Sequence, residues 1–199
     1  MGSFDSCKKN IVVALCGLIF VIVSLSSAFA GEKRNAILSD QSGCPAILLT
    51  NEDYFPALLK AIDEAQSEIF MSIFSFKVGA HKNSYPDRIL GHLAKTVKRG
   101  VKVTVILETT SRLDDELNAQ NRQTGKLLEE KGVKVYFDSP RTTTHTKLIV
   151  IDERVVILGS HNLTQSALKY NNEISVMLSR PDLAKRARDY MLTIIKEAK

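Results

Sequence analysis

Residues 145–162 read HTKLIVIDERVVILGSHN, and this stretch decides how the middle of the fold is built. Its first half is rich in β-branched and apolar residues, which predicts an extended strand. His145 and Lys147 are two positions apart, so their side chains leave the same face of that strand. Residues 152–158 predict a turn and a second strand that returns beside the first. The polar segment 159–162, GSHN, is therefore expected close to His145.

An imidazole and an ammonium in one pocket suit chemistry at a phosphodiester. The imidazole of His145 can attack phosphorus as a nucleophile. Lys147, the hydroxyl of Ser160 and the amide of Asn162 can bind the phosphate oxygens and stabilise the charge that develops on them. Gly159 can let the backbone come close to a ligand. The stretch thus predicts a phosphodiesterase active site, in which Lys147, Ser160 and Asn162 bind the substrate.

The same residues resemble the HxKxxxxD and GSxN signature of the phospholipase D superfamily, and the similarity extends to Asn171-Asn172-Glu173. The order of elements from about Ala46 onward is similar to that of the single-motif nucleases of this family. The resemblance implies that Glu173 accepts a hydrogen bond from the second nitrogen of His145 and fixes its tautomer. It also groups Asp152 with the catalytic residues, although Asp152 lies in a predicted turn and is expected to act through hydrogen bonds or ion pairs. The predicted catalytic set is therefore His145, Lys147, Asp152 and Glu173, whereas His161 is expected to line the site without an essential role.

Only one copy of the motif is present in the sequence. Displacement by a histidine nucleophile also needs an acid for the leaving oxygen, and one His–Lys set does not easily supply both groups. The resemblance implies that short members of the family pair two chains. We therefore expect a homodimer with one composite active site at its two-fold axis, in which one His145 attacks and its symmetry mate protonates the leaving group.

The predicted activity is that of a metal-independent phosphodiesterase, foremost a non-specific endonuclease that hydrolyses DNA or RNA through a phosphohistidine intermediate. The sequence has no Cys/His cluster at zinc spacing and no paired carboxylates for magnesium, so no metal and no cofactor are predicted. The formal net charge of +5, of which residues 31–199 keep +4, suits a polyanionic substrate such as nucleic acid. Two alternatives stay open: a phospholipase D-type lipid phosphodiesterase acting on phospholipid, and a non-catalytic nucleic-acid-binding module. A non-catalytic binding module would not require the nucleophile that the motif retains.

The first thirty residues have the pattern of a signal peptide. Lys8 and Lys9 precede an apolar run at 11–23, and Ala28-Phe29-Ala30 forms a small-x-small cleavage site. This pattern predicts export to the periplasm or the medium, with an exported chain that begins at Gly31. The alternative is an uncleaved inner-membrane anchor, because about 20 residues can span a bilayer. Residues 31–199 would then form one phospholipase D-like phosphodiesterase domain.

Strands and helices alternate along the remaining chain. Strands are predicted at 46–49, 69–76, 101–107, 133–137 and 173–178, and helices at 51–65, 87–99, 114–131 and 181–198. Asp87 is expected to cap its helix and Gly100 to end it. The alternation predicts an α/β fold with a mixed, largely central β-sheet flanked by helices on both faces. Lys77, His81 and Lys82 lie in the loop after a central strand, where active-site rims are often built.

Overall fold

The computed structural model describes residues 45–81, 83–110 and 116–198 of the chain. The predicted signal peptide or anchor at 1–30 lies outside these residues, as does Lys82. None of the helices within the described ranges is long and apolar enough to cross a membrane.

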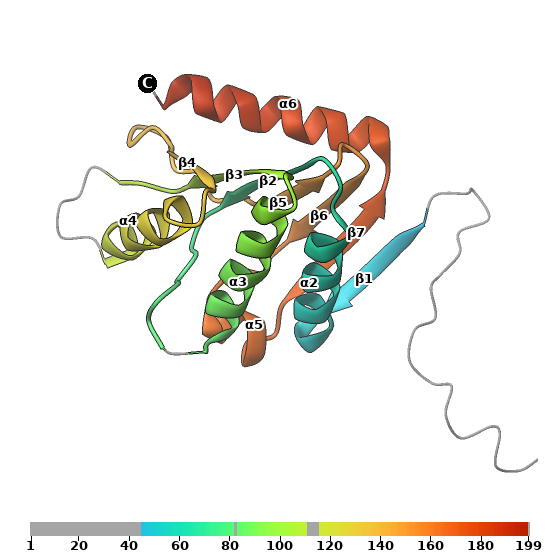
Figure 1. Ribbon diagram of the computed structural model, residues 1–199, viewed down its shortest axis with the longest axis horizontal. Helices are drawn as coiled ribbons and strands as arrows, with labels where there is room; N and C mark the ends of the chain where they lie inside the picture. The colour runs from blue at the N-terminus through green and yellow to red at the C-terminus, as the bar shows by residue number, and fades with distance from the viewer. Residues whose placement is uncertain (1–44, 82, 111–115, 199) are drawn as a thin grey trace, which may run out of the picture. The chain divides into compact units, whose positions relative to one another are not determined.

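A central sheet of seven strands in the order β1-β7-β6-β5-β2-β3-β4 organises this part of the chain (Figure 1). Strands β2, β3 and β4 are parallel, whereas β5, β6, β7 and β1 continue the sheet with antiparallel pairs. The mixed character follows from the connections, since helices join the parallel strands and a tight turn joins β5 to β6. The strands are β1 Ala46–Thr50, β2 Glu68–Ile73, β3 Lys102–Leu107, β4 Lys134–Phe137, β5 Lys147–Ile151, β6 Val155–Gly159 and β7 Ile174–Ser179.

Helices cover both faces of the sheet, which confirms the predicted fold class (Figure 1). On one face α2 and α3 pack over a large apolar cluster that includes Leu58, Leu93 and Ile149. On the other face α6 packs over a smaller cluster around Phe70 and Met191. The helices are η1 Asn51–Asp53, α2 Tyr54–Glu64, α3 Tyr85–Lys98, α4 Glu116–Glu129, α5 Gln165–Lys169 and α6 Pro181–Glu197.

The start of α3 differs from the prediction. The helix begins at Tyr85, and the cap is Ser84, whose hydroxyl oxygen accepts from the backbone N–H of Asp87 at 3.3 Å. Pro86 fits the first turn because no helical hydrogen bond is needed from its nitrogen. The Asp87 carboxylate instead accepts from the N–H of Gly79 at 2.8 Å and ties the preceding loop to the helix. The assignment of Asp87 as the cap is therefore wrong, whereas Gly100, at φ 90°, ends the helix as predicted.

Strand β2 ends earlier than predicted, at Ile73 instead of Phe76. The chain then leaves β5, and Phe76 pairs with Leu163 in an isolated parallel bridge. The short helix α5, which the sequence did not predict, follows this bridge. The exchange of partners brings the end of the GSHN segment against the chain that follows β2.

The turn between β5 and β6 is anchored to the start of β2 by Asp152. Its carboxylate accepts from the backbone N–H groups of Gln66, Ser67 and Glu68 at 2.9, 2.8 and 3.0 Å, and from the Ser67 hydroxyl at 2.8 Å. Burial alone would raise the pKa of Asp152, but these hydrogen bonds hold it below its ordinary value. Asp152 and His145 stand at opposite ends of β5, separated by roughly 20 Å of extended chain. The structure thus separates Asp152 from the catalytic set and gives it the hydrogen-bonding role expected of a turn residue.

Replacing Asp152 by Ala should lower the free energy of unfolding by about 1–3 kcal/mol, because three backbone donors lose their acceptor. The depressed pKa means that this stabilisation is present above the unfolded value of about 3.9 and is lost as the pH falls through the folded-state pKa. Urea unfolding at neutral and acidic pH measures both effects. The control is Asp189→Ala, which removes only an exposed ion pair with Lys185. Equal losses in the two variants would contradict this role of Asp152.

Candidate active site

One end of the sheet gathers most of the residues that the motif predicts. Because β5 is antiparallel to β2, Lys147 at the start of β5 lies opposite Ile73 at the end of β2. Strand β6 then returns to the same end, where the N–H of Ser160 donates to the carbonyl of Ile174 at 2.9 Å. The predicted proximity of the GSHN segment to the start of β5 is confirmed.

The ring of Phe74 contacts both His145 and Lys147. The imidazole of His145 meets it edge-on, with centroids 4.5 Å apart, and the Nζ atom of Lys147 lies 4.8 Å from the ring centroid. His145 and Lys147 therefore share one side of the chain, as their spacing predicts. His145 is exposed, whereas Lys147 is only 9% exposed. The imidazole is accessible to solvent and the ammonium beside it is largely shielded from water.

Lys147 is held in place by its own neighbourhood. Its ammonium donates to the carbonyl oxygen of His145 at 3.1 Å. Burial lowers the pKa of Lys147, and the nearby Glu173 carboxylate opposes this shift without cancelling it. The arrangement places a desolvated cation beside His145, where it can stabilise negative charge on a phosphoryl group more strongly than a solvated one could.

Glu173 occupies a different place from the one that the resemblance implies. Its carboxylate accepts from the hydroxyl of Ser160 and, at 3.1 Å, from the side-chain amide of Asn171. Within the described residues no hydrogen bond joins Glu173 to His145. The backbone of Glu173 is fixed from outside the motif, because its N–H donates to the side-chain oxygen of Asn51 at 2.8 Å. The predicted contact between Glu173 and His145 is therefore absent from the described residues. The Ser160 hydroxyl, which was predicted to donate to a phosphate oxygen, donates to the Glu173 carboxylate.

Asn51 is a residue that sequence reasoning missed. It adopts φ 45°, a left-handed conformation that Asn tolerates better than most residues, at the junction of β1 and η1. Its N–H donates to the carbonyl of Glu173 at 2.9 Å, and its carbonyl is 3.2 Å from Nε2 of His161. The positive φ has no clear sequence signal, since Asn51 was expected only to open a helix.

His161 is a structural residue. It is fully buried and its ring stacks on Tyr54, with centroids 4.1 Å apart and planes 6° from parallel. Because Nε2 faces a carbonyl acceptor, that nitrogen carries the proton, and Nδ1 accepts from the Ser175 hydroxyl at 2.8 Å. Burial lowers the pKa of His161, which agrees with a neutral ring. His161 therefore anchors the GSHN segment to Ser175, Asn51 and Tyr54, and it does not line an open site as was expected.

Gly159 also serves the packing of the strands. A Cβ atom at this position would lie 2.2 Å from the hydroxyl oxygen and 2.4 Å from the Cα atom of Ser175. Strands β6 and β7 approach so closely here that only glycine fits. The predicted close approach of the Gly159 backbone therefore exists. It is made to β7, however, and not to the ligand that was predicted.

Two buried oxygens at the site have no hydrogen-bond partner among the described residues: Ser75 Oγ and Asn162 Oδ1. The bridge between Phe76 and Leu163 is parallel, so Ser75 and Asn162 are neighbours across it. Buried polar atoms in proteins are nearly always paired, which makes such atoms candidates for ligand contacts. Ser75 Oγ, which the motif does not include, can donate to a phosphate oxygen. Asn162 Oδ1 can only accept, so the predicted contact of Asn162 with a phosphate oxygen has to come from its NH₂ group.

Polar residues of α4 hold the chain after β2 in its irregular path. Asn121, fully buried, accepts from the N–H of Phe76 at 3.1 Å and donates to the carbonyl of Phe74 at 2.8 Å. Thr124 donates to the carbonyl of Phe76 at 2.5 Å and accepts from the N–H of Val78 at 3.1 Å. The sequence does carry a signal for this supporting role. Polar residues occupy positions of α4 where an amphipathic helix normally carries apolar residues.

The comparisons with known proteins agree with this geometry. Residues 58–195 match the family described as cardiolipin synthase, PLD-like domain. The chain belongs to the phospholipase D superfamily. Mitochondrial cardiolipin hydrolase of Mus musculus is 32% identical over 133 residues, which are 66% of this chain and 53% of that protein. Polyphosphate kinase of Vibrio parahaemolyticus is 24% identical over 131 residues, which are 62% of this chain and 18% of the kinase.

This phospholipase D-like chain therefore spans about half the length of the cardiolipin hydrolase and less of the kinase. Among solved structures, the phospholipase D family member Nuc from Salmonella typhimurium superposes with a TM-score of 0.66 at 22% identity. The superposition covers 78% of this chain and 97% of Nuc. The likeness to Nuc confirms the predicted fold.

Glu173 should control the charge of Lys147. Replacing Glu173 by Gln removes a carboxylate that raises the pKa of Lys147, so this pKa should fall further below its ordinary value. Lys147 would then lose its proton at a lower pH than in the wild type, which NMR titration of labelled lysine ammonium groups can follow. Glu64→Gln, which removes the exposed partner of Lys60, is the matched control. An unchanged titration of Lys147 in Glu173→Gln would contradict the electrostatic role of Glu173.

Proposed function

We propose that this chain is a metal-independent phosphodiesterase whose nucleophile is His145 and whose main substrate is nucleic acid. The observation that carries the proposal is the placement of an exposed imidazole and a shielded ammonium on one ring, that of Phe74. Membership in the phospholipase D superfamily supports a reaction at a phosphodiester. Within the described residues, no group of three His, Cys, Asp or Glu side chains is arranged to hold a metal ion.

The reaction would proceed in two displacements. In the first, a nitrogen of His145 attacks phosphorus, the bond to the leaving oxygen breaks, and an acid donates a proton to that oxygen. Lys147 stabilises the negative charge on the non-bridging oxygens, and the Asn162 carboxamide contacts the phosphoryl group. In the second, water attacks phosphorus, the bond to His145 breaks, and the former acid accepts a proton from the water. His161, the other histidine of the motif segment, is buried and neutral and is therefore not available as this acid.

The acid is proposed to be His145 of a second copy of the chain. A composite site of this kind needs a surface for the second copy at the same end of the sheet. Three large apolar side chains form a patch near this end, on the face of the sheet opposite to the Lys147 side chain because Leu158 pairs with Leu148: Leu48, Ile174 and Leu158 are 60%, 54% and 42% exposed. Leu48 and Leu158 both lie opposite Val176, so they belong to one row across β1, β7 and β6. Apolar side chains in adjacent strands beside an incomplete site favour a homodimer.

Nucleic acid is favoured as the substrate by the open position of His145 and by the basic character of the chain. A polymer can reach an exposed imidazole on a sheet end without being enclosed. The formal net charge of +5 would attract a polyanion. DNA and RNA both meet these conditions, and the proposed enzyme cleaves either with little sequence preference.

A phospholipid substrate is the second candidate. Two observations favour it: the curated relative named mitochondrial cardiolipin hydrolase and the exposed apolar patch formed by Leu48, Ile174 and Leu158. In this alternative the patch would lie against acyl chains instead of a second copy of the chain. Parallel assays with single-stranded DNA, RNA and cardiolipin vesicles, all in the presence of EDTA, separate the two candidates. Hydrolysis of the vesicles alone would replace the nuclease assignment, and loss of all activity in EDTA would overturn metal independence.

His145→Asn should lower kcat/KM on nucleic acid by roughly 10⁴-fold or more, because one substitution removes both the nucleophile and the acid of a homodimer. The matched control is His92→Asn, since His92 pairs with Asp63 at 2.7 Å and joins α3 to α2 away from the site. Cleavage rates on labelled DNA measure the effect. Retention of more than about a tenth of wild-type activity by His145→Asn would contradict the assigned role.

Leu48→Lys should convert an active dimer into a monomer with little activity, because it places a charge in the proposed interface. Leu48 is on the edge strand β1, where lysine is well tolerated, so folding should be preserved. Sedimentation and cleavage assays at the same protein concentration give both readouts. Tyr190→Lys, which changes another exposed apolar side chain on α6, should remain dimeric and active. A fully active monomer of either the wild type or Leu48→Lys would contradict the composite site.

A further inference from the structure

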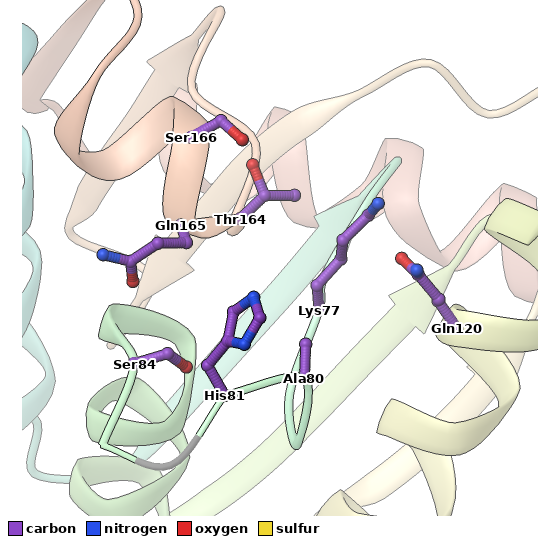
Figure 2. A pocket seen from close by; sticks show the side chains of 8 residues that line it. All are labelled: Lys77, Ala80, His81, Ser84, Gln120, Thr164, Gln165 and Ser166. Carbon is purple, nitrogen blue, oxygen red and sulfur yellow. The ribbon is translucent and has the colours of Figure 1, made fainter.

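A small pocket of about 200 Å³ opens beside the candidate active site. It lies between the chain after β2, the start of α3 and the segment that enters α5, with α4 forming its other wall. Figure 2 shows the side chains of Lys77 and His81 between Gln165 and Thr164 on one side and Gln120 on the other. We call it the Lys77 pocket.

The Lys77 pocket continues the two segments that build the active site. The N–H of Lys77 donates to the carbonyl of Leu163 at 3.0 Å, next to the bridge between Phe76 and Leu163. Lys77 follows Phe74 by three residues and Thr164 follows Asn162 by two. Three residues of chain span at most about 10 Å, so the pocket and the site are neighbours.

Hydrogen-bond donors dominate the walls of the Lys77 pocket. The oxygen of Thr164 accepts from the N–H of Ala167 at 3.2 Å, which leaves its proton for a ligand. The side-chain oxygen of Gln165 accepts from the N–H of Tyr85 at 2.8 Å, which leaves its amide group to donate. Together with the ammonium of Lys77 and the imidazole of His81, these groups suit an anion.

Two further features indicate that a ligand can compete for Lys77. Its partner in the structure is Glu116 at 3.9 Å, a carboxylate whose side chain is 82% exposed, and exposed pairs of this kind are weak. The Glu116 carboxylate also accepts from the side-chain amide of Gln120 at 2.9 Å, so it keeps a partner when Lys77 leaves it. The buried side-chain oxygen of Gln120 has no partner among the described residues, but as an acceptor it contributes nothing to the binding of an anion. An anion in the pocket could therefore take Lys77 from Glu116 at little cost.

We propose that the Lys77 pocket binds a second phosphate of a polynucleotide, one that is not cleaved. This proposal rests on the proposed nuclease function. The pocket is smaller than the roughly 300–1,000 Å³ of sites for drug-sized ligands, which suits one phosphate group. A strand in a duplex rises about 3.4 Å per nucleotide along the helix axis while its phosphates also wind around that axis, so a neighbour within about 10 Å corresponds to a phosphate one or two nucleotides from the scissile bond.

The test compares a single-stranded oligonucleotide with bis(4-nitrophenyl) phosphate, a diester that has one phosphate and cannot fill the Lys77 pocket. Lys77→Gln should lower kcat/KM on the oligonucleotide about tenfold more than on the small diester, as expected for the loss of one charge-assisted hydrogen bond. It should also reduce the slope of log affinity against log salt concentration by about 0.7 for the oligonucleotide. Lys77→Arg should restore much of the difference, and His81→Gln, at an exposed position, gives an independent variant that is expected to fold.

Lys185→Gln is the matched control, because Lys185 also pairs with a carboxylate but lies on α6 over the opposite face of the sheet. It should leave the ratio of the two activities unchanged. Equal losses on both substrates in Lys77→Gln, or no loss on either, would overturn the second-phosphate site while the nuclease function stands. A wild type that hydrolyses the small diester but leaves every oligonucleotide intact would overturn the nuclease function, and the polynucleotide site with it.

Discussion

The antiparallel pairing of β5 with β2 is the constraint on which the rest of the site depends. Asp152 fixes this pairing at one end, where its carboxylate accepts from the N–H groups that begin β2. Lys147 then falls opposite Ile73 at the other end, and His145 comes to lie against Phe74. A slip of one residue would send the Lys147 side chain to the opposite face of the sheet. A carboxylate at the far end of β5 thus sets the position of the groups that are proposed to perform the chemistry.

Much of the fold was predictable because its signals are local. The apolar run after Lys147, the turn at Asp152 and the return strand follow from residue type and spacing, and the structure shows this hairpin. The alternation of strands and helices gave the correct class, since βα units generate parallel strands between layers of helices. The wrong prediction of the helix cap at the start of α3 also concerns a local choice. Ser84 and Asp87 are both good caps, and composition alone does not choose between two acceptors that lie three residues apart.

The fine geometry of the site was not predictable in the same way. Asn51 holds the backbone of Glu173 from 122 residues away, and the Glu173 carboxylate accepts from Ser160. Phe74 follows the periodicity of a core residue, although its ring contacts both His145 and Lys147. Asn121 supports the chain after β2 from α4, and only the packed structure brings the two together. Long-range hydrogen bonds of this kind leave no periodic pattern in a single sequence.

The central claim is that His145 forms a covalent bond to phosphorus, and trapping that intermediate tests it most directly. Wild-type protein should be mixed with a substrate labelled with ³²P at the scissile phosphate and quenched within the first turnover. The account predicts label on the protein, located on the peptide that contains His145, stable in base and lost in acid as for a phosphoramidate. Cleavage of the substrate with no label on the protein at any quench time, or label on another residue, would contradict it.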